Sequence, residues 1–207
     1  MLKYLVLLLL TGCTIAPKSP APVSTFDFGP ISRIESAQLP TFSSITLQVA
    51  DVIAPTWLDT RAMRYRLAYH HPAQTHAYAN NRWAASPASL LTERIKQHIT
   101  SWQNPSDRSG RNARPIGNYT LAIELEEFIQ VFETVDRSHA IVSLRARLVE
   151  RDTRLPVAQK RFSRIQITPS ADASGAAEAF IAISDHLTAE LIQWSAERAG
   201  YRPASLK

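Results

Sequence analysis

The strongest constraint on the fold of this chain is a pair of long segments, residues 119–132 and 139–150, in which apolar and polar side chains alternate. A period of two is typical of β-strands, because successive side chains point to opposite faces of a sheet. A turn centred on Asp136 and Arg137 joins the segments, which predicts an antiparallel hairpin with one apolar and one polar face. In the register that this turn implies, the facing pairs are Glu126 with Arg147, Phe128 with Arg145, Leu125 with Leu148, Ile129 with Leu144, and Val131 with Val142.

Three residues of the first segment depart from this alternation. Glu127 falls on the apolar face, while Phe128 and Phe132 fall on the polar face. One interpretation is a β-bulge, in which an extra residue re-aims the side chains that follow it. The other is that the two phenylalanines belong to a surface that contacts a partner. The sequence alone leaves both interpretations open.

The remaining segments predict an α+β domain. Ser86 followed by Pro87 indicates a helix start, and apolar residues recur behind it at helical spacing as far as Trp102. A second helix is predicted at residues 173–198; its apolar stripe either binds lipid or faces the core, and we favour the core because the sheet needs a cover. Further strands are predicted at residues 45–52, 63–69, 77–83 and 157–167, and a polar loop at residues 103–118. The expected fold has two amphipathic helices on a mainly antiparallel sheet, in the order β-β-β-α-β-β-β-α.

The N-terminus has the layout of a bacterial lipoprotein signal. Lys3 precedes an apolar run at residues 5–10, and the stretch L-T-G-C ends at Cys13, the single cysteine of the chain. A positive residue, a short apolar run and small residues before a cysteine are what export and processing require. The run is shorter than the ~20 residues that span a bilayer. We predict a signal peptide at residues 1–12 and lipidation of Cys13, with an ordinary secretory signal as the alternative.

The residues after the signal indicate a single folded domain on an extended tether. Residues 13–25 are proline-rich and predict an extended tether. Residues 26–207 have a length that suits a single domain. Thr14, rather than an aspartate, follows Cys13, so we predict the periplasmic face of the outer membrane of a Gram-negative host. The formal net charge of +5 suits anionic head groups or acidic partners, and we expect no nucleic acid among the partners.

The residues predict no catalytic, metal or cofactor site. His70, His71 and His76 form the one histidine cluster, but no carboxylate or cysteine completes a set of metal ligands. The sequence has neither a nucleophile elbow nor a glycine-rich phosphate loop. Glu124 and Glu126 lie on a strand face beside arginines, which favours ion pairs over an acid/base pair. We therefore predict that the protein is not an enzyme.

Three stretches resemble the ABC-type transport auxiliary lipoprotein family, and they are T-F-D-F-G-P at residues 25–30, P-T-W-L-D-T-R-A-M-R-Y-R-L at residues 55–67 and A-Y-A-N-N-R-W-A-A at residues 77–85. This family includes the lipoprotein of the paraquat-inducible system, and the resemblance covers almost the whole chain. It implies an outer-membrane lipoprotein that works with an inner-membrane ABC permease and ATPase and with an MCE-domain protein. Such systems are associated with phospholipid movement across the periplasm. The resemblance also leaves open a homo-oligomer.

The second of these stretches has two physical interpretations. It reads as a turn that runs into a strand, in which case it specifies packing alone. Alternatively, its arginines form a basic surface that contacts an acidic partner or phospholipid head groups. The candidate surface comprises Arg61, Arg64, Arg66, Arg82, Phe128 and Phe132.

Three functions from different classes follow. The first is a non-catalytic, membrane-anchored accessory of an ABC/MCE-type transport system that moves phospholipids between the inner and outer membranes. The alternative is a periplasmic lipid carrier or chaperone, which needs an apolar cavity of its own, on the order of several hundred cubic ångströms. A periplasmic hydrolase is the least favoured. A cavity between the second helix and the sheet would favour the carrier, and a filled core with an exposed patch would favour docking.

Overall fold

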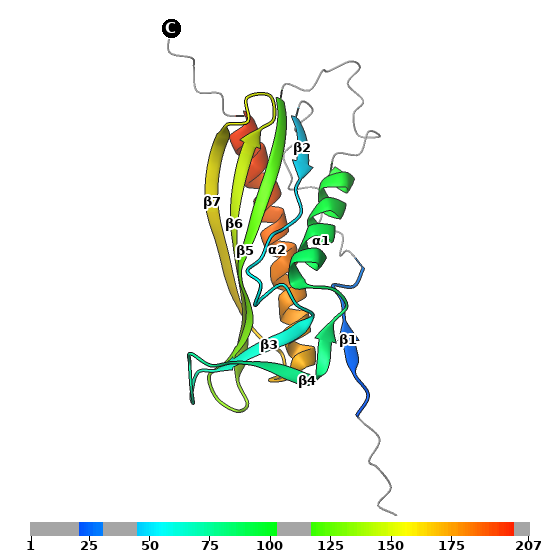
Figure 1. The fold of residues 1–207 in the computed structure, drawn as a ribbon, viewed down its shortest axis with the longest axis vertical. Helices are drawn as coiled ribbons and strands as arrows, with labels where there is room; N and C mark the ends of the chain where they lie inside the picture. Colours follow the sequence, from blue (N-terminus) through cyan, green and yellow to red (C-terminus); the bar gives the residue numbers. More distant parts are fainter. Residues whose placement is uncertain (1–20, 31–44, 103–116, 201–207) are drawn as a thin grey trace, which may run out of the picture.

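The computed structural model describes residues 21–30, 45–102 and 117–200. The signal peptide, Cys13 and residues 103–116 of the predicted loop lie outside these residues. The elements in chain order are β1 (Ser24–Phe26), β2 (Ile45–Val49), β3 (Ala62–Leu67), β4 (Thr75–Trp83), α1 (Pro87–Trp102), β5 (Gly117–Phe132), β6 (Ser138–Glu150), β7 (Pro156–Ile167) and α2 (Ala173–Gly200). The fold is α+β, as expected, with α2 packed on β5, β6 and β7 and with α1 packed beside α2 and β2 (Figure 1).

The sheet has seven strands and is mixed, so the prediction of a mainly antiparallel sheet was wrong. Its order is β1-β4-β3-β5-β6-β7, and β2 also pairs with β5. Three pairings are parallel, β1 with β4, β2 with β5 and β3 with β5, while the pairs within β3–β4, β5–β6 and β6–β7 are antiparallel. Alternation within a segment indicates a strand, but it carries no information about the direction of the neighbouring strand.

The predicted element order also needs a correction, because a strand precedes the first predicted one. β1 runs parallel to β4, with Thr25 facing Arg82 and Phe26 facing Trp83. Its first two residues belong to the stretch predicted as a tether. Three residues are too few to show an alternating pattern, so only the pairing with β4 identifies this segment as a strand.

The β5–β6 hairpin forms as predicted, but its register differs. Leu125 faces Leu144 rather than Leu148, and Glu124 faces Arg145. The register shifts between Leu125 and Glu127, which places the extra residue of a β-bulge at Glu126. The bulge interpretation of the broken alternation is therefore confirmed. Because one inserted residue exchanges the two faces, every side chain beyond it points the other way.

Helix α1 begins and packs as the sequence predicts. The Ser86 hydroxyl accepts a hydrogen bond from the Ser89 backbone N–H at 3.4 Å, the arrangement of a helix N-cap. Leu91 and Ile95 are fully buried at helical spacing. Thr92 on the same face accepts a hydrogen bond from the Val52 N–H at 2.8 Å, which joins the helix to the chain after β2.

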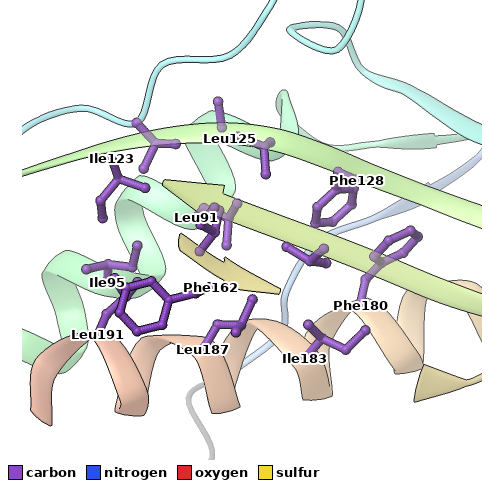
Figure 2. Packing of buried hydrophobic residues seen from close by; sticks show 14 of the residues in the cluster. Leu91, Ile95, Ile123, Leu125, Phe128, Phe162, Phe180, Ile183, Leu187 and Leu191 are labelled. Carbon is purple, nitrogen blue, oxygen red and sulfur yellow. The ribbon is translucent and has the colours of Figure 1, made fainter. Parts of the chain in front are cut away.

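Helix α2 covers the apolar face of the sheet. Its stripe of Phe180, Ile183, Leu187, Leu191 and Trp194 is buried, so the core-facing interpretation is confirmed. Figure 2 shows the first four of these side chains, Phe180, Ile183, Leu187 and Leu191, pointing from α2 toward the strands and toward α1. No helix in residues 21–30, 45–102 or 117–200 combines the length and apolar character needed to cross a bilayer.

The start of α2 is fixed by a cap. The Asp172 carboxylate accepts hydrogen bonds from the Gly175 N–H and the Ser170 hydroxyl, each at 2.8 Å. A Cβ atom on Gly175 would lie 2.2 Å from the Ser170 carbonyl oxygen, so the close approach of the loop requires glycine at this position. The Gly175 N–H first, and then the Ser170 hydroxyl, lower the pKa of Asp172.

Candidate functional site

Strand β3 places its arginines on one face. Met63 is buried in the core, and side chains alternate along a strand, so Arg64 and Arg66 lie on the opposite face. Ala62 faces Arg82 of β4 in the register of the sheet, which adds Arg82 to that same face. Three of the four predicted arginines are therefore brought together on the face of β3 and β4 that points away from the core.

Two guanidinium groups on this face have N–H donors that are not paired with an acceptor among the described residues. The Cζ atom of Arg64 lies 5.9 Å from the centre of the Trp57 ring, in a cation–π contact. The Nε atoms of Arg64 and Arg66 are both buried, and neither has a hydrogen-bond partner within the described part of the chain. A partner could not reach these buried Nε atoms, but both side chains are partly exposed, so a carboxylate or phosphate from outside would meet the rest of each guanidinium group.

The fourth predicted arginine has a structural role. The Arg61 Nε–H donates a hydrogen bond to the Trp83 carbonyl oxygen at 3.0 Å. In the backbone, the Trp83 N–H donates to the Arg61 carbonyl oxygen at 2.8 Å. Arg61 therefore closes the β3–β4 pair, and its guanidinium group is partly committed to that contact.

Phe128 and Phe132 do not lie on the candidate surface, because the bulge at Glu126 turns both toward the interior. Phe128 is 2% exposed and stacks on Phe180 with ring centres 4.0 Å apart. Phe132 is 8% exposed and meets the Tyr65 ring edge-on at 5.6 Å. Their assignment to a contact surface is corrected: both are packing residues.

The bulge also accounts for the positions of Glu126 and Glu127, of which Glu127 broke the predicted alternation. Glu126 forms ion pairs with Arg145 and, at 2.6 Å, with Arg161. The predicted role of Glu126 in an ion pair is confirmed, although its partner is not Arg147. Glu127, one residue further, faces Ser143.

The histidine cluster lies in and beside the β3–β4 turn. His70 and His71 are in the turn, with their ring centres 4.4 Å apart. His76 stacks on Tyr65 at 5.2 Å. Within the described ranges, no three residues of the His, Cys, Asp and Glu types are grouped so that they could hold a metal ion.

Sequence reasoning missed two buried polar centres. Arg94 lies among apolar residues of α1 and donates hydrogen bonds to the carbonyl oxygens of Phe28 and, at 3.4 Å, Pro30. Gln130 is fully buried in β5 and accepts a hydrogen bond from the Tyr78 hydroxyl at 2.8 Å. The signal for Arg94 was its position, three residues after Leu91 on the buried stripe.

An open groove lies between β2 and α1. It has a volume of about 550 Å³ and a mixed lining, in which Leu47, Val49, Ala50 and Ile99 are apolar and Gln48 and Thr100 are polar. Asp51 and Lys96 also line it and form an ion pair at 2.7 Å. This groove is separate from the interface of α2 with the sheet, where the stacked rings of Phe128 and Phe180 fill the space.

Comparison with known proteins gives one family and a shared fold. The model of a family described as ABC-type transport auxiliary lipoprotein component matches residues 31–192. A crystal structure of a protein from Xanthomonas campestris is similar over 88% of this chain and 91% of its own, at 18% identity and a TM-score of 0.62. The structure of an uncharacterized protein is similar over 84% of this chain and 98% of its own, at 14% identity and a TM-score of 0.60. No curated protein matches this chain.

Proposed function

Because this chain belongs to the family of ABC-type transport auxiliary lipoprotein components, we propose that it is a non-catalytic accessory subunit of an ABC/MCE-type transport system. In this proposal an inner-membrane permease and ATPase supply the energy, and an MCE-domain protein carries phospholipid between the membranes. The family match over residues 31–192 is the observation that carries the proposal.

The anchor in this proposal is Cys13. Cleavage after residue 12 would leave the cysteine as the lipid-bearing N-terminus, followed by the tether at residues 13–25 and one domain at residues 26–207. Thr14 favours the periplasmic face of the outer membrane. Cys13→Ser should move the protein from the membrane fraction to the soluble fraction of a cell lysate, whereas Thr14→Ser should leave it in the membrane fraction.

The docking surface in this proposal is the outward face of β3 and β4, made by Arg64, Arg66 and Arg82. The partly exposed guanidinium groups of Arg64 and Arg66, which share a face with Arg82, support an acidic contact there. We propose an acidic patch on the MCE-domain protein as the partner of this face. Arg61 contributes less, because its Nε–H is already bonded to β4.

The packing of the core supports docking over the carrier alternative. The interface of α2 with the sheet is filled by aromatic and aliphatic side chains, and a lipid chain would have to displace them. The carrier remains a second candidate because of the groove between β2 and α1, whose volume suits part of a lipid.

The test is affinity purification of the tagged, full-length lipoprotein from gently solubilised membranes. We expect the MCE-domain protein and its permease to be recovered with it. The double variant Arg64→Glu and Arg66→Glu, which reverses both charges, should reduce that recovery by about tenfold or more. A tenfold reduction corresponds to ~1.4 kcal/mol in the free energy of binding. Arg151→Glu is the matched control, because Arg151 is exposed in the turn between β6 and β7 and should leave recovery unchanged.

The outcomes separate the two candidates. Equal recovery with the charge-reversed and control variants would reject the arginine surface, and failure to recover any transport protein would reject the accessory role. Mass spectrometry of the same samples would detect bound phospholipid. The carrier would be favoured if the wild-type protein bound phospholipid in a stoichiometric amount and the groove variant Val49→Trp lost it.

A further inference from the structure

The two most exposed large apolar side chains of the described residues lie at one end of the molecule. Ile167 at the end of β7 is 81% exposed, and Val135 in the β5–β6 turn is 77% exposed. Ile165 and Tyr69 are also exposed. We call these four residues the hairpin end. Exposed apolar groups that cluster in this way mark an interaction site more often than singly scattered ones do.

Backbone contacts hold the hairpin end together. His139, directly after the β5–β6 turn, faces Ile167 in the register of β6 with β7. The Thr168 N–H donates a hydrogen bond to the Ser138 carbonyl oxygen at 3.0 Å. On the other side of the turn, the Ala68 N–H donates to the Phe132 carbonyl oxygen at 2.9 Å, which places Tyr69 beside the turn.

The chain enters the fold at this same end. Figure 1 shows β1 beginning at the lower end of the molecule, where the β3–β4 hairpin and the β5–β6 turn also lie, whereas α2 ends at the opposite end. Ten residues separate Cys13 from Ser24. In an extended form they reach about 30 Å, at ~3.1 Å per residue. An anchor at Cys13 would therefore keep the hairpin end close to the bilayer.

The chemistry of the hairpin end suits the head-group region. The β3–β4 turn, residues 68–74, contains a tyrosine, two histidines and no acidic residue, and tyrosine favours the membrane–water interface. The carboxylates of the β5–β6 turn have local partners. Glu133 lies 3.3 Å from His139, and Asp136 accepts a hydrogen bond from the Thr134 hydroxyl at 2.6 Å.

We propose that the hairpin end rests in the head-group region of the membrane that holds the lipid anchor, with Val135, Ile165, Ile167 and Tyr69 inserted among the lipids. The protein would then stand on the bilayer in one orientation, with α2 pointing away from it. This inference rests on the proposed anchor at Cys13. A membrane is favoured over a second copy of the chain because the apolar groups occur on separate turns and a strand end, on the side from which the tether leaves.

The test places a fluorescent reporter at each end of β7. Lipidation consumes Cys13, so a new cysteine in the full-length lipidated protein is the sole free thiol. Ile167→Cys and Leu155→Cys carry the same environment-sensitive label. Leu155 is the matched control, because it is 63% exposed and apolar but lies about 40 Å away at ~3.3 Å per residue along the strand. Val135→Cys provides a second reporter at the hairpin end.

The labelled proteins are reconstituted into vesicles of equal parts phosphatidylethanolamine and phosphatidylglycerol, with and without brominated acyl chains. We expect a blue-shifted emission at positions 167 and 135 and quenching by brominated lipid that is several-fold stronger than at position 155. Equal or absent quenching at the two ends of β7, in protein that sediments with the vesicles, would overturn the docking of this end and leave the anchor intact.

Two other outcomes would also overturn the proposal. A blue shift at position 167 that grows with protein density but is insensitive to brominated lipid would identify a second copy of the chain as the occupant. Failure of the unlabelled protein to sediment with vesicles would reject the anchor itself, and with it this orientation.

Discussion

Arg94 is a single side chain that joins three distant parts of the chain. It is 2% exposed, donates to the carbonyl oxygens of Phe28 and Pro30, and lies 3.5 Å from the Asp185 carboxylate of α2. Its Cζ atom also lies 5.7 Å from the centre of the Phe28 ring. The N-terminal segment is therefore held against both helices by one guanidinium group, whose several donors suit several acceptors at once.

Replacing Arg94 with alanine should lower the free energy of unfolding by about 3 kcal/mol or more, because Asp185 would lose its buried partner and the carbonyl oxygens their donor. Lys96→Ala on the same helix is the matched control. Lys96 forms its ion pair with Asp51 at the surface, so its loss should have little effect. Urea denaturation followed by tryptophan fluorescence measures both variants. Equal destabilisation by the two substitutions would contradict this role of Arg94.

At the scale of the elements, the bulge in β5 decides which side chains enter the core. Before the bulge, Leu125 points inward, and after it, Phe128 points inward, although the two are three positions apart and would lie on opposite faces of a regular strand. Without the extra residue, Phe128 and Phe132 would face the solvent. Glu126, the extra residue, is itself held by Arg145 and Arg161.

Deletion of Glu126 should therefore be far more damaging than its substitution. The deletion would turn Phe128 and Phe132 outward, at a loss of at least about 3 kcal/mol from their burial alone. Glu126→Ala removes only ion pairs with exposed arginines and should cost about 1 kcal/mol or less. Denaturation midpoints of the two variants provide the comparison. A deletion variant as stable as the alanine variant would mean that the bulge does not set the facing of β5.

The cap of α2 gives a prediction with a defined pH dependence. The Asp172 carboxylate accepts from the Gly175 N–H and the Ser170 hydroxyl, and both contacts lower its pKa in the folded state. Its stabilisation is therefore complete above the unfolded pKa of about 4 and is lost as the pH falls through the lower, folded pKa. Asp172→Ala should lower stability by about 1 kcal/mol at neutral pH.

The difference between wild type and Asp172→Ala should shrink as the pH is lowered from about 4, because the native carboxylate becomes protonated. Asp172→Asn is the control, since an amide oxygen caps the helix without titrating. Urea denaturation of all three proteins across this pH range is the measurement. A difference that stayed constant would show that the charge of Asp172 plays no part in the cap.

At the scale of the whole molecule, the sequence predicted the features that neighbouring residues determine. It did not predict the features that depend on contacts between distant segments. The start of α1 at Ser86 and the buried stripe of α2 are local patterns, and both are confirmed. The shared face of Arg64 and Arg66 follows from alternation with Met63. The short β1, the parallel direction of β2 and β3 and the bulge at Glu126 each depend on a partner strand, which no local pattern specifies.

The central place of β5 also has a consequence for the time at which the fold can form. Both β2 and β3 pair with β5, and neither pairs with the other. A chain synthesised from its N-terminus produces these strands more than 60 residues before β5 is complete at Phe132. Contacts of long sequence separation form slowly, since the intervening chain must first be closed into a loop. We expect the N-terminal third, the part that bears the tether, to emerge first and to become ordered last.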